Sequence, residues 1–210
     1  MGQKDLAIFL SKLETFKSPD MKNEQYSTDS EIAAEILWFA YMNEDIEGNI
    51  ITDSGAGTGI LGIGALLLGA KKVFFVEKDK EAVNILKKNL EKLDTKNYEI
   101  INKDINDFKK KCDVVIQNPP FGTKEAGADI KFLEKATSLA KIVYSFHKSE
   151  TKRFVNKKID QLKFDMTHYF EFDFPLKKTM DHHKKKVEKI SVGCWRIKKH
   201  KNGFAKKFKE

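Results

Sequence analysis

A glycine-rich segment, residues 53–62, has the composition of a ligand-binding turn between a strand and a helix. Glycine lets the chain turn abruptly and lets a ligand approach the backbone closely, since it carries no Cβ atom. The spacing Gly57-x-Gly59-x-x-Gly62 fits the dinucleotide fingerprint, and Glu77 follows Gly57 by 77 − 57 = 20 positions, where an acid binds ribose hydroxyls. A nicotinamide cofactor is therefore one interpretation of this segment.

Two further carboxylates favour S-adenosylmethionine instead. Asp53 begins the segment, where its charge would repel a pyrophosphate but would orient the amino-acid end of a sulfonium cofactor. Asp104 follows a third predicted strand, so we expect it beside the adenine amino group of the cofactor. Both interpretations stay open on the glycine-rich segment alone.

A second candidate site is Asn118-Pro119-Pro120-Phe121, which directly follows a predicted strand. Strand ends in a parallel sheet share one crevice, so this segment should face the glycine-rich one. The Asn118 side-chain oxygen and the Pro119 carbonyl would accept both hydrogens of an exocyclic base amine and direct its lone pair at a methyl group. The prolines stiffen these acceptors, and Phe121 offers a flat surface for stacking on an extruded base. Neither a metal ion nor a side-chain base is required.

The elements that must position these segments alternate between strands and helices. A first helix is predicted at residues 4–16, and a second begins at Thr28, which forms a capping-box pattern with Glu31. Strands are predicted at residues 50–53, 73–77, 98–101, 113–117 and 142–146. Helices are predicted at residues 58–68, 80–93, 130–139 and 151–162. Such alternation predicts a parallel sheet that is covered on both faces.

The C-terminal part has a different pattern. Apolar and polar residues alternate over residues 168–174, which predicts a half-buried strand, and residues 189–197 are expected to return beside it, antiparallel. The predicted fold class is α/β: a Rossmann-like, mostly parallel seven-stranded sheet with helices on both faces and an antiparallel C-terminal strand. The 210 residues suit a single domain, divided into a helical arm (1–48), a core (49–197) and a basic tail (198–210).

Charge and composition limit the partners and the compartment. Lysine and arginine number 39 against 31 acidic residues, a net charge of +8 that suits a polyanion but also an ordinary solvated surface. The two cysteines, Cys112 and Cys194, form neither a disulfide framework nor a zinc site. No apolar stretch is long enough to cross a bilayer. We therefore expect a soluble protein of the cytoplasm, with no membrane partner.

Taken together, these motifs resemble a known family. Residues 53–62 with Asn118–Phe121 resemble class I adenine-N6 methyltransferases. The wider set of residues 24–28, 118–124, 143–148 and 182–186 is similar to methyltransferase-like protein five and its archaeal relatives, over residues 16–197. The resemblance implies a class I methyltransferase fold and transfer of a methyl group from S-adenosylmethionine to N6 of one adenosine in small-subunit ribosomal RNA. It also implies a small zinc-binding activator protein as a partner.

The resemblance assigns roles to individual residues. The expected cofactor-binding residues are Gln25, Thr28, Asp53, Gly55, Thr58, Gly59, Ile60, Glu77 and Asp104. The expected catalytic residues, which hold the target base, are Asn118, Pro119, Pro120 and Phe121. The expected RNA-backbone contacts are Lys148, Lys152 and Arg153 with the cluster His182-His183-Lys184-Lys185-Lys186. His147 is expected to pack beside the pocket and not to act as a base.

Several other functions are compatible with parts of this pattern. Methylation of DNA adenine or of a protein glutamine would use the same Asn-Pro-Pro-aromatic segment. A nicotinamide-dependent oxidoreductase would use the glycine-rich segment. A non-catalytic RNA-binding assembly factor would keep the fold as a scaffold, although the intact residues 118–121 argue against loss of activity.

Overall fold

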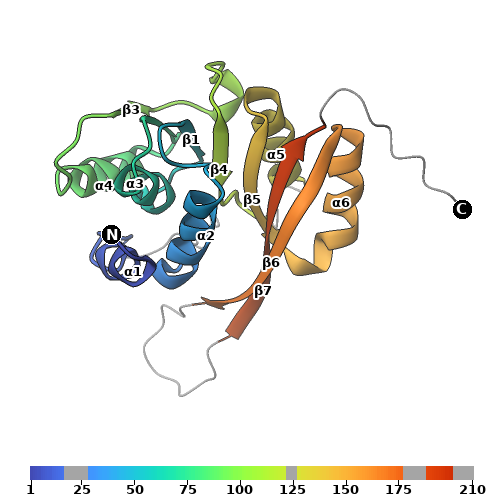
Figure 1. Cartoon of the computed structure of the whole chain (residues 1–210), viewed down its shortest axis with the longest axis horizontal. Coiled ribbons are helices and arrows are strands. Elements are labelled where there is room, and N and C mark those ends of the chain that lie inside the picture. The colour runs from blue at the N-terminus through green and yellow to red at the C-terminus, as the bar shows by residue number, and fades with distance from the viewer. Residues whose placement is uncertain (17–27, 122–126, 177–187, 201–210) are drawn as a thin grey trace, which may run out of the picture.

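The computed structural model describes residues 1–16, 28–121, 127–176 and 188–200. Its centre is a seven-stranded sheet with the order β3-β2-β1-β4-β5-β7-β6 (Figure 1). The strands are β1 (Ile50–Ser54), β2 (Lys72–Val76), β3 (Tyr98–Ile101), β4 (Val114–Gln117), β5 (Ile142–Lys148), β6 (Phe164–Leu176) and β7 (Glu188–Lys199). Strands β1 to β5 are parallel, whereas β7 pairs antiparallel with both β5 and β6. The predicted fold class is therefore confirmed.

Helices cover both faces of this sheet (Figure 1). The helices are α1 (Gln3–Leu10), α2 (Ser30–Met42), α3 (Ile60–Leu67), α4 (Lys80–Leu90), α5 (Ala128–Leu139) and α6 (Lys152–Gln161), with 3-10 turns η2 (Ile105–Asp107) and η3 (Ser149–Thr151). One buried hydrophobic cluster includes residues of α1 to α4, and a second includes residues of α5 and α6. All four residues of β4 are buried, as expected for a central strand covered on two sides.

The first helix is shorter than predicted. It ends at Leu10 and not at Phe16, although Leu13 beyond it is still buried. The cause lies at Glu14, whose backbone N–H and C=O are both hydrogen-bonded to the side chain of Asn89 in α4. The apolar residues of this segment therefore reflect packing on the core and not a continued helix.

The start of the second helix also corrects a prediction. Asp29, not Thr28, caps α2, since its Oδ1 accepts hydrogen bonds from the backbone N–H of Glu31 at 2.9 Å and of Ile32 at 3.4 Å. Aspartate and threonine are both good capping residues, and the sequence places them side by side. The Thr28 side chain is left for another partner.

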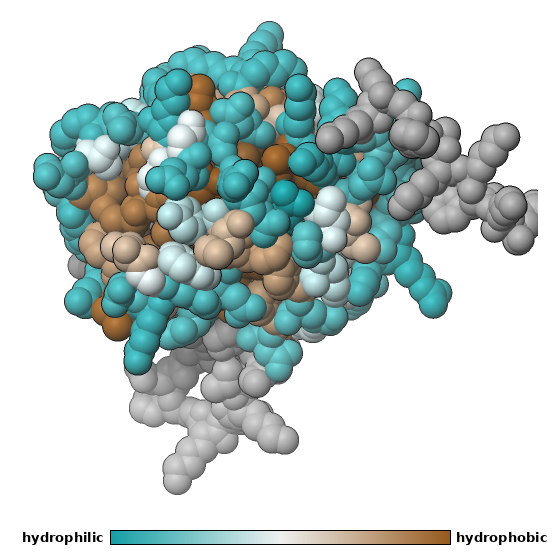
Figure 2. All heavy atoms as spheres, viewed as in Figure 1, coloured by the Kyte–Doolittle hydropathy of each residue, from teal (hydrophilic) through white to brown (hydrophobic). Residues whose placement is uncertain are grey.

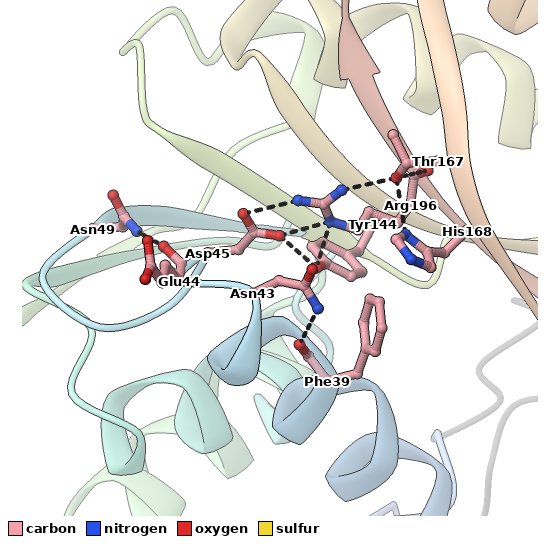
Figure 3. Close-up of polar contacts among 9 residues, drawn as sticks. All are labelled: Phe39, Asn43, Glu44, Asp45, Asn49, Tyr144, Thr167, His168 and Arg196. Carbon is pink, nitrogen blue, oxygen red and sulfur yellow. Dashed lines mark hydrogen bonds and ion pairs between the residues drawn. The ribbon is translucent and has the colours of Figure 1, made fainter.

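A buried ion pair joins the N-terminal helices to the C-terminal strands (Figure 3). Arg196 of β7 donates from Nε to Oδ2 of Asp45 at 2.8 Å and from Nη2 to Oδ1 at 3.2 Å. The Tyr144 hydroxyl donates to the same Oδ2 at 2.6 Å, and burial together with Asp45 raises the pKa of this tyrosine. Arg196 also donates from Nη1 to the Thr167 hydroxyl at 2.8 Å. Segments 151 positions apart are thereby held together.

The strands β6 and β7 extend further than predicted. The predicted alternation along β6 holds from Phe170 to Phe174: Phe174 is buried and packs against Phe146 with ring centroids 5.9 Å apart, whereas Asp173 is exposed. It is wrong at His168, which is exposed and follows a register shift in the pairing with β7. Strand β7 continues to Lys199, two residues past the predicted end of the core at residue 197. The division into arm, core and tail stays a prediction.

The outer surface is polar over most of the face shown in Figure 2. Hydrophilic residues follow the outline of this face, and apolar residues gather towards its middle and left. None of the helices in the described residues is long and apolar enough to cross a membrane.

Candidate active site

A cavity of about 330 Å³ lies at the carboxyl ends of the central parallel strands. Asp53 at the end of β1, Glu77 after β2 and Asn118 after β4 all line it. Ligands of open parallel sheets bind at this edge, because the strand order reverses direction there and leaves a crevice. The two candidate segments of the sequence therefore share one cavity, as predicted.

Most of the predicted site residues contribute to this wall. The predicted residues that line the cavity are Thr28, Asp53, Gly55, Thr58, Ile60, Glu77, Asp104, Asn118 and Pro120. Three described residues of the prediction, Gly59, Pro119 and Phe121, are not part of the lining and are buried behind it. Gln25 lies outside the described residues.

The glycine-rich segment needs glycine at specific positions. Gly57 has φ +55° and Gly59 has φ +93°, a left-handed conformation that side chains disfavour. A Cβ atom on Gly59 would also lie 2.3 Å from the Leu86 side chain of α4, so this glycine permits close packing of the turn. Gly57 donates its backbone N–H to Oε2 of Glu77 at 2.8 Å, which ties the turn to the end of β2.

Asp53 is a buried carboxylate that faces the cavity. Its side chain is 1% exposed, and Oδ2 accepts a hydrogen bond from the backbone N–H of Gly62 at 2.8 Å. Burial raises the pKa of Asp53 to about 8, despite the lowering effect of the Gly62 hydrogen bond and with a further increase from Glu77. A cationic group in the cavity would stabilise the ionised form, since opposite charges nearby favour it.

Three other carboxylates line the same cavity, and two of them, Glu77 and Asp104, were predicted site residues. Glu77 accepts backbone hydrogen bonds from Gly57 and, through Oε1, from Asp79 at 2.8 Å. Asp104 caps η2 and accepts from Asn106, and its Oδ2 lies 3.9 Å from Lys78 Nζ. Such acceptors suit a ligand that carries ribose hydroxyls, an exocyclic amine and an ammonium group. They suit the pyrophosphate of a dinucleotide less well, because like charges repel.

Asn118 lines the cavity and has an unpaired side-chain oxygen. Its Nδ2 donates to the Thr28 hydroxyl at 3.0 Å, while its Oδ1 is buried and has no hydrogen-bond partner among the described residues. A buried acceptor without a partner costs free energy, so its retention here is typical of a ligand-binding atom. No group of three or more potential metal ligands occurs in the described residues.

Comparisons with known proteins decide between the open interpretations. Residues 33–168 match the family described as Conserved hypothetical protein 95. The rRNA N(6)-adenosine-methyltransferase METTL5 of Danio rerio is 35% identical over 199 residues, 91% of this chain and 96% of the relative. The Drosophila melanogaster protein of the same name is 34% identical over 91% of this chain and 94% of its own. A solved structure from Pyrococcus horikoshii, described as a candidate RNA methyltransferase, is 43% identical with a TM-score of 0.86 and covers 95% of this chain and 98% of its own.

The chain belongs to the METTL5 family of rRNA N6-adenosine methyltransferases. The recognition from sequence motifs is therefore confirmed, and the chain is an enzyme of the methyltransferase class.

In this METTL5-family chain, the sequence analysis missed lining residues such as Phe16, Lys103 and Phe132, and also Asn89, which supports the cavity wall without lining it. Asn89 of α4 is fully buried, and its Nδ2 donates to the carbonyls of Glu14 at 2.9 Å and Thr58 at 3.0 Å, while Oδ1 accepts from Glu14 N–H at 2.7 Å. It thereby joins the N-terminal arm, which brings Phe16 into the cavity wall, to the glycine-rich segment. No motif marks Asn89, because its partners are backbone atoms that any residue could supply.

The predicted RNA contacts are only partly placed. Lys148 at the end of β5 lies 3.6 Å from Glu150, and Arg153 is exposed on α6. Neither lines the cavity. The Nζ atom of Lys152 lies 3.4 Å from the ring centroid of Tyr169. His183, Lys184 and Lys185 fall outside the described residues.

Proposed function

We propose that the protein transfers a methyl group from S-adenosylmethionine to N6 of an adenosine in small-subunit ribosomal RNA. Membership of the METTL5 family supports the reaction class. The observation that carries the proposal is that Asn118 lines the cavity while its buried Oδ1 has no hydrogen-bond partner among the described residues.

The orientation of Asn118 suits an amine substrate. Because Thr28 accepts from Nδ2, the atom left for a ligand is the oxygen. This oxygen can accept a hydrogen bond but cannot donate one. An adenine N6 carries two hydrogens, and in this proposal Asn118 Oδ1 accepts one and the Pro119 carbonyl accepts the other. Acceptors fixed before the reaction need no reorganisation while charge develops on nitrogen.

The carboxylates of the cavity fit the cofactor. S-adenosylmethionine, when bound, supplies an electrophilic methyl group on a sulfonium centre. Asp53 would hold the ammonium group, Glu77 the ribose hydroxyls and Asp104 the adenine amine. Gly55, Thr58 and Ile60 would provide the adjacent wall, and Gly59 would support it from behind.

Phe121 is retained as the residue that stacks on the target base. Its side chain is 9% exposed and belongs to the hydrophobic core in this structure, so stacking requires the ring to turn towards the base. Pro120, by contrast, already lines the cavity.

The partners follow from charge and family. We place Lys148, Lys152, Arg153 and residues 182–186 on the RNA backbone, where lysine-rich surfaces bind through phosphate contacts. A small zinc-binding activator protein, taken from the family resemblance, and a cytoplasmic location, taken from the composition, are further parts of the proposal.

Labelled methyl transfer to separate small-subunit RNA, large-subunit RNA, DNA and a glutamine-bearing protein tests the substrate. Nucleoside analysis of the small-subunit product should show N6-methyladenosine. Asn118→Ala should abolish transfer while leaving S-adenosylhomocysteine affinity within about threefold of wild type, because only the acceptor is removed. Full turnover by Asn118→Ala would refute the role of this residue, and transfer to DNA or protein alone would refute the substrate. No transfer to any substrate, with the activator protein also supplied, would support the assembly-factor alternative.

A further inference from the structure

Four buried polar side chains form a continuous hydrogen-bonded chain beneath the candidate active site. Gln117 Nε2 lies 2.9 Å from Ser145 Oγ, and Ser145 Oγ lies 2.8 Å from His147 Nε2. His147 Nδ1 lies 2.8 Å from Asp129 Oδ2. The first three residues are fully buried, and Asp129 is 9% exposed. None of the four lines the cavity.

The donors and acceptors of this chain agree in one direction. Gln117 donates to Ser145, and the tautomer of His147 with its proton on Nδ1 lets Ser145 donate to Nε2 while Nδ1–H donates to Asp129. The two ring nitrogens of His147 therefore have one polar neighbour each. Burial raises the pKa of Asp129. The hydrogen bond and charge of His147, together with backbone N–H groups, lower this pKa by more, so the net shift is a decrease. Asp129 also lies in the first turn of α5, where a negative charge is favoured.

The positions of these four hydrogen-bonded residues in the sequence show which segments they connect. Gln117 ends β4 and directly precedes Asn118, while Asp129 begins α5, so the connection carrying the base-binding residues lies between them. Ser145 and His147 are on β5, the neighbour of β4 in the sheet (Figure 1). His147 thus bridges the two ends of the connection through residues on a rigid strand.

Gln117 depends on this chain for its side-chain orientation. Its Oε1 is buried and has no hydrogen-bond partner among the described residues. Within those residues, the bond from Nε2 to Ser145 is therefore the one hydrogen bond of the Gln117 side chain. A loss of Ser145 or of its neighbour His147 would free the residue next to Asn118. Displacement of a catalytic group by about 1 Å can cost about a hundredfold in rate.

We propose that His147 is a positioning residue for methyl transfer, which fixes Asn118 at the cavity by bridging Asp129 and, through Ser145, Gln117. The proposal rests on the proposed role of Asn118. His147 neither contacts the cavity nor needs to exchange a proton.

Enzyme assays on four variants test this role. Asp129→Ala and Ser145→Ala should each lower kcat about tenfold or more, with S-adenosylhomocysteine affinity within about threefold of wild type. Asp129→Asn retains an acceptor for Nδ1–H and should recover most of the turnover that Asp129→Ala loses. Leu139→Ala, at the opposite end of α5, is the matched control, since it removes buried side-chain atoms from the same helix without touching the chain of hydrogen bonds.

The outcomes separate positioning from mere stability. Loss of turnover in Leu139→Ala to the same degree as in Asp129→Ala, measured well below the unfolding temperature, would show a structural role only. Failure of Asp129→Asn to recover turnover would refute the hydrogen-bonded bridge. Full turnover in Asp129→Ala or Ser145→Ala would refute the proposal outright.

A measurement that does not depend on turnover tests the positioning role of His147 separately from the proposed function. The side-chain amide of Asn118 gives NMR signals that report its environment. We expect Asp129→Ala and Ser145→Ala to shift or broaden these signals and Leu139→Ala to leave them in place. If the wild-type protein methylates no substrate, the proposed function fails, while unchanged Asn118 signals in both bridge variants would refute the positioning role.

Discussion

The side-chain nitrogen of Asn118 donates to the Thr28 hydroxyl at 3.0 Å, across 90 positions of the chain. An asparagine amide can turn either its oxygen or its nitrogen towards a ligand, and the two ends have opposite hydrogen-bonding character. Thr28, which is 5% exposed, accepts from the nitrogen in this structure, so the oxygen is the end of the amide left for another partner. A residue of the N-terminal arm is therefore a direct hydrogen-bond partner of the Asn118 side chain.

Replacement of Thr28 by valine should lower turnover more than cofactor binding. Valine keeps the shape but removes the acceptor, which leaves Asn118 Nδ2 without its partner and the amide free to rotate. An unpaired buried donor costs about 1–3 kcal/mol, so we expect kcat to fall about tenfold. Steady-state kinetics on RNA with a separate calorimetric titration of S-adenosylhomocysteine measures both quantities.

Thr28→Ser is the control for this prediction, since it restores a hydroxyl at the same position. It should recover most of the activity lost in Thr28→Val. A raised KM for the cofactor with an unchanged kcat in Thr28→Val would instead mean that Thr28 serves cofactor binding alone.

The same residue shows where sequence reasoning fails. Thr28 and Glu31 fit a capping box, but Asp29 occupies the cap, and local pattern cannot choose between two adjacent capping residues. Motifs at strand ends are more informative: residues 53–62 and 118–121 were expected at one crevice and share one cavity. Their placement follows from strand alternation, which fixes the parallel sheet and hence its binding edge.

Contacts between distant segments were not predictable in this way. Asn89 binds backbone atoms of Glu14 and Thr58, and Asp45 pairs with Arg196 across 151 positions. Neither contact leaves a periodic signal, because each depends on how separate elements pack. The fold class therefore followed from pattern, whereas these side-chain connections required the structure.

Cofactor binding should depend on pH through Asp53. Burial raises the pKa of this carboxyl to about 8, so the unliganded protein largely retains its proton at neutral pH. Binding of a ligand ammonium favours the ionised form and expels that proton. Affinity for S-adenosylhomocysteine should thus increase from about pH 6 to about pH 8 and level off above.

Calorimetry in buffers of different ionisation enthalpy measures this proton directly. At about pH 6 the wild-type protein should release about one proton per ligand. Asp53→Asn should bind more weakly and abolish the release, with a flatter pH profile. Equal proton release by Asp53→Asn would assign the effect to another group.

Loss of Arg196 should destabilise the fold without changing the cavity. Arg196→Met leaves the Asp45 carboxylate, 3% exposed, without its cation although the hydrogen bond from Tyr144 remains, and loss of one partner of a buried ion pair costs about 3–5 kcal/mol. Adding Asp45→Asn should recover part of the loss, because the unpaired charge is removed. Denaturant unfolding measures the free energy, and S-adenosylhomocysteine affinity of the folded variants should stay unchanged, since neither residue lines the cavity. An Arg196→Met variant that is as stable as the wild type would show that the Asp45–Arg196 pair contributes no net stability.

Replacement of Asn89 by leucine should weaken cofactor binding. Leucine has a similar size but leaves the Thr58 carbonyl and both backbone groups of Glu14 without their partner, so the glycine-rich segment and the arm that carries Phe16 are no longer joined. We expect Kd for S-adenosylhomocysteine to increase about tenfold and kcat at saturating cofactor to change little, because Asn118 is not affected. Asn84→Leu, on the exposed face of the same helix, is the matched control and should bind like wild type. An unchanged Kd in a folded Asn89→Leu variant would show that the arm packs on the core without contributing to the cofactor site.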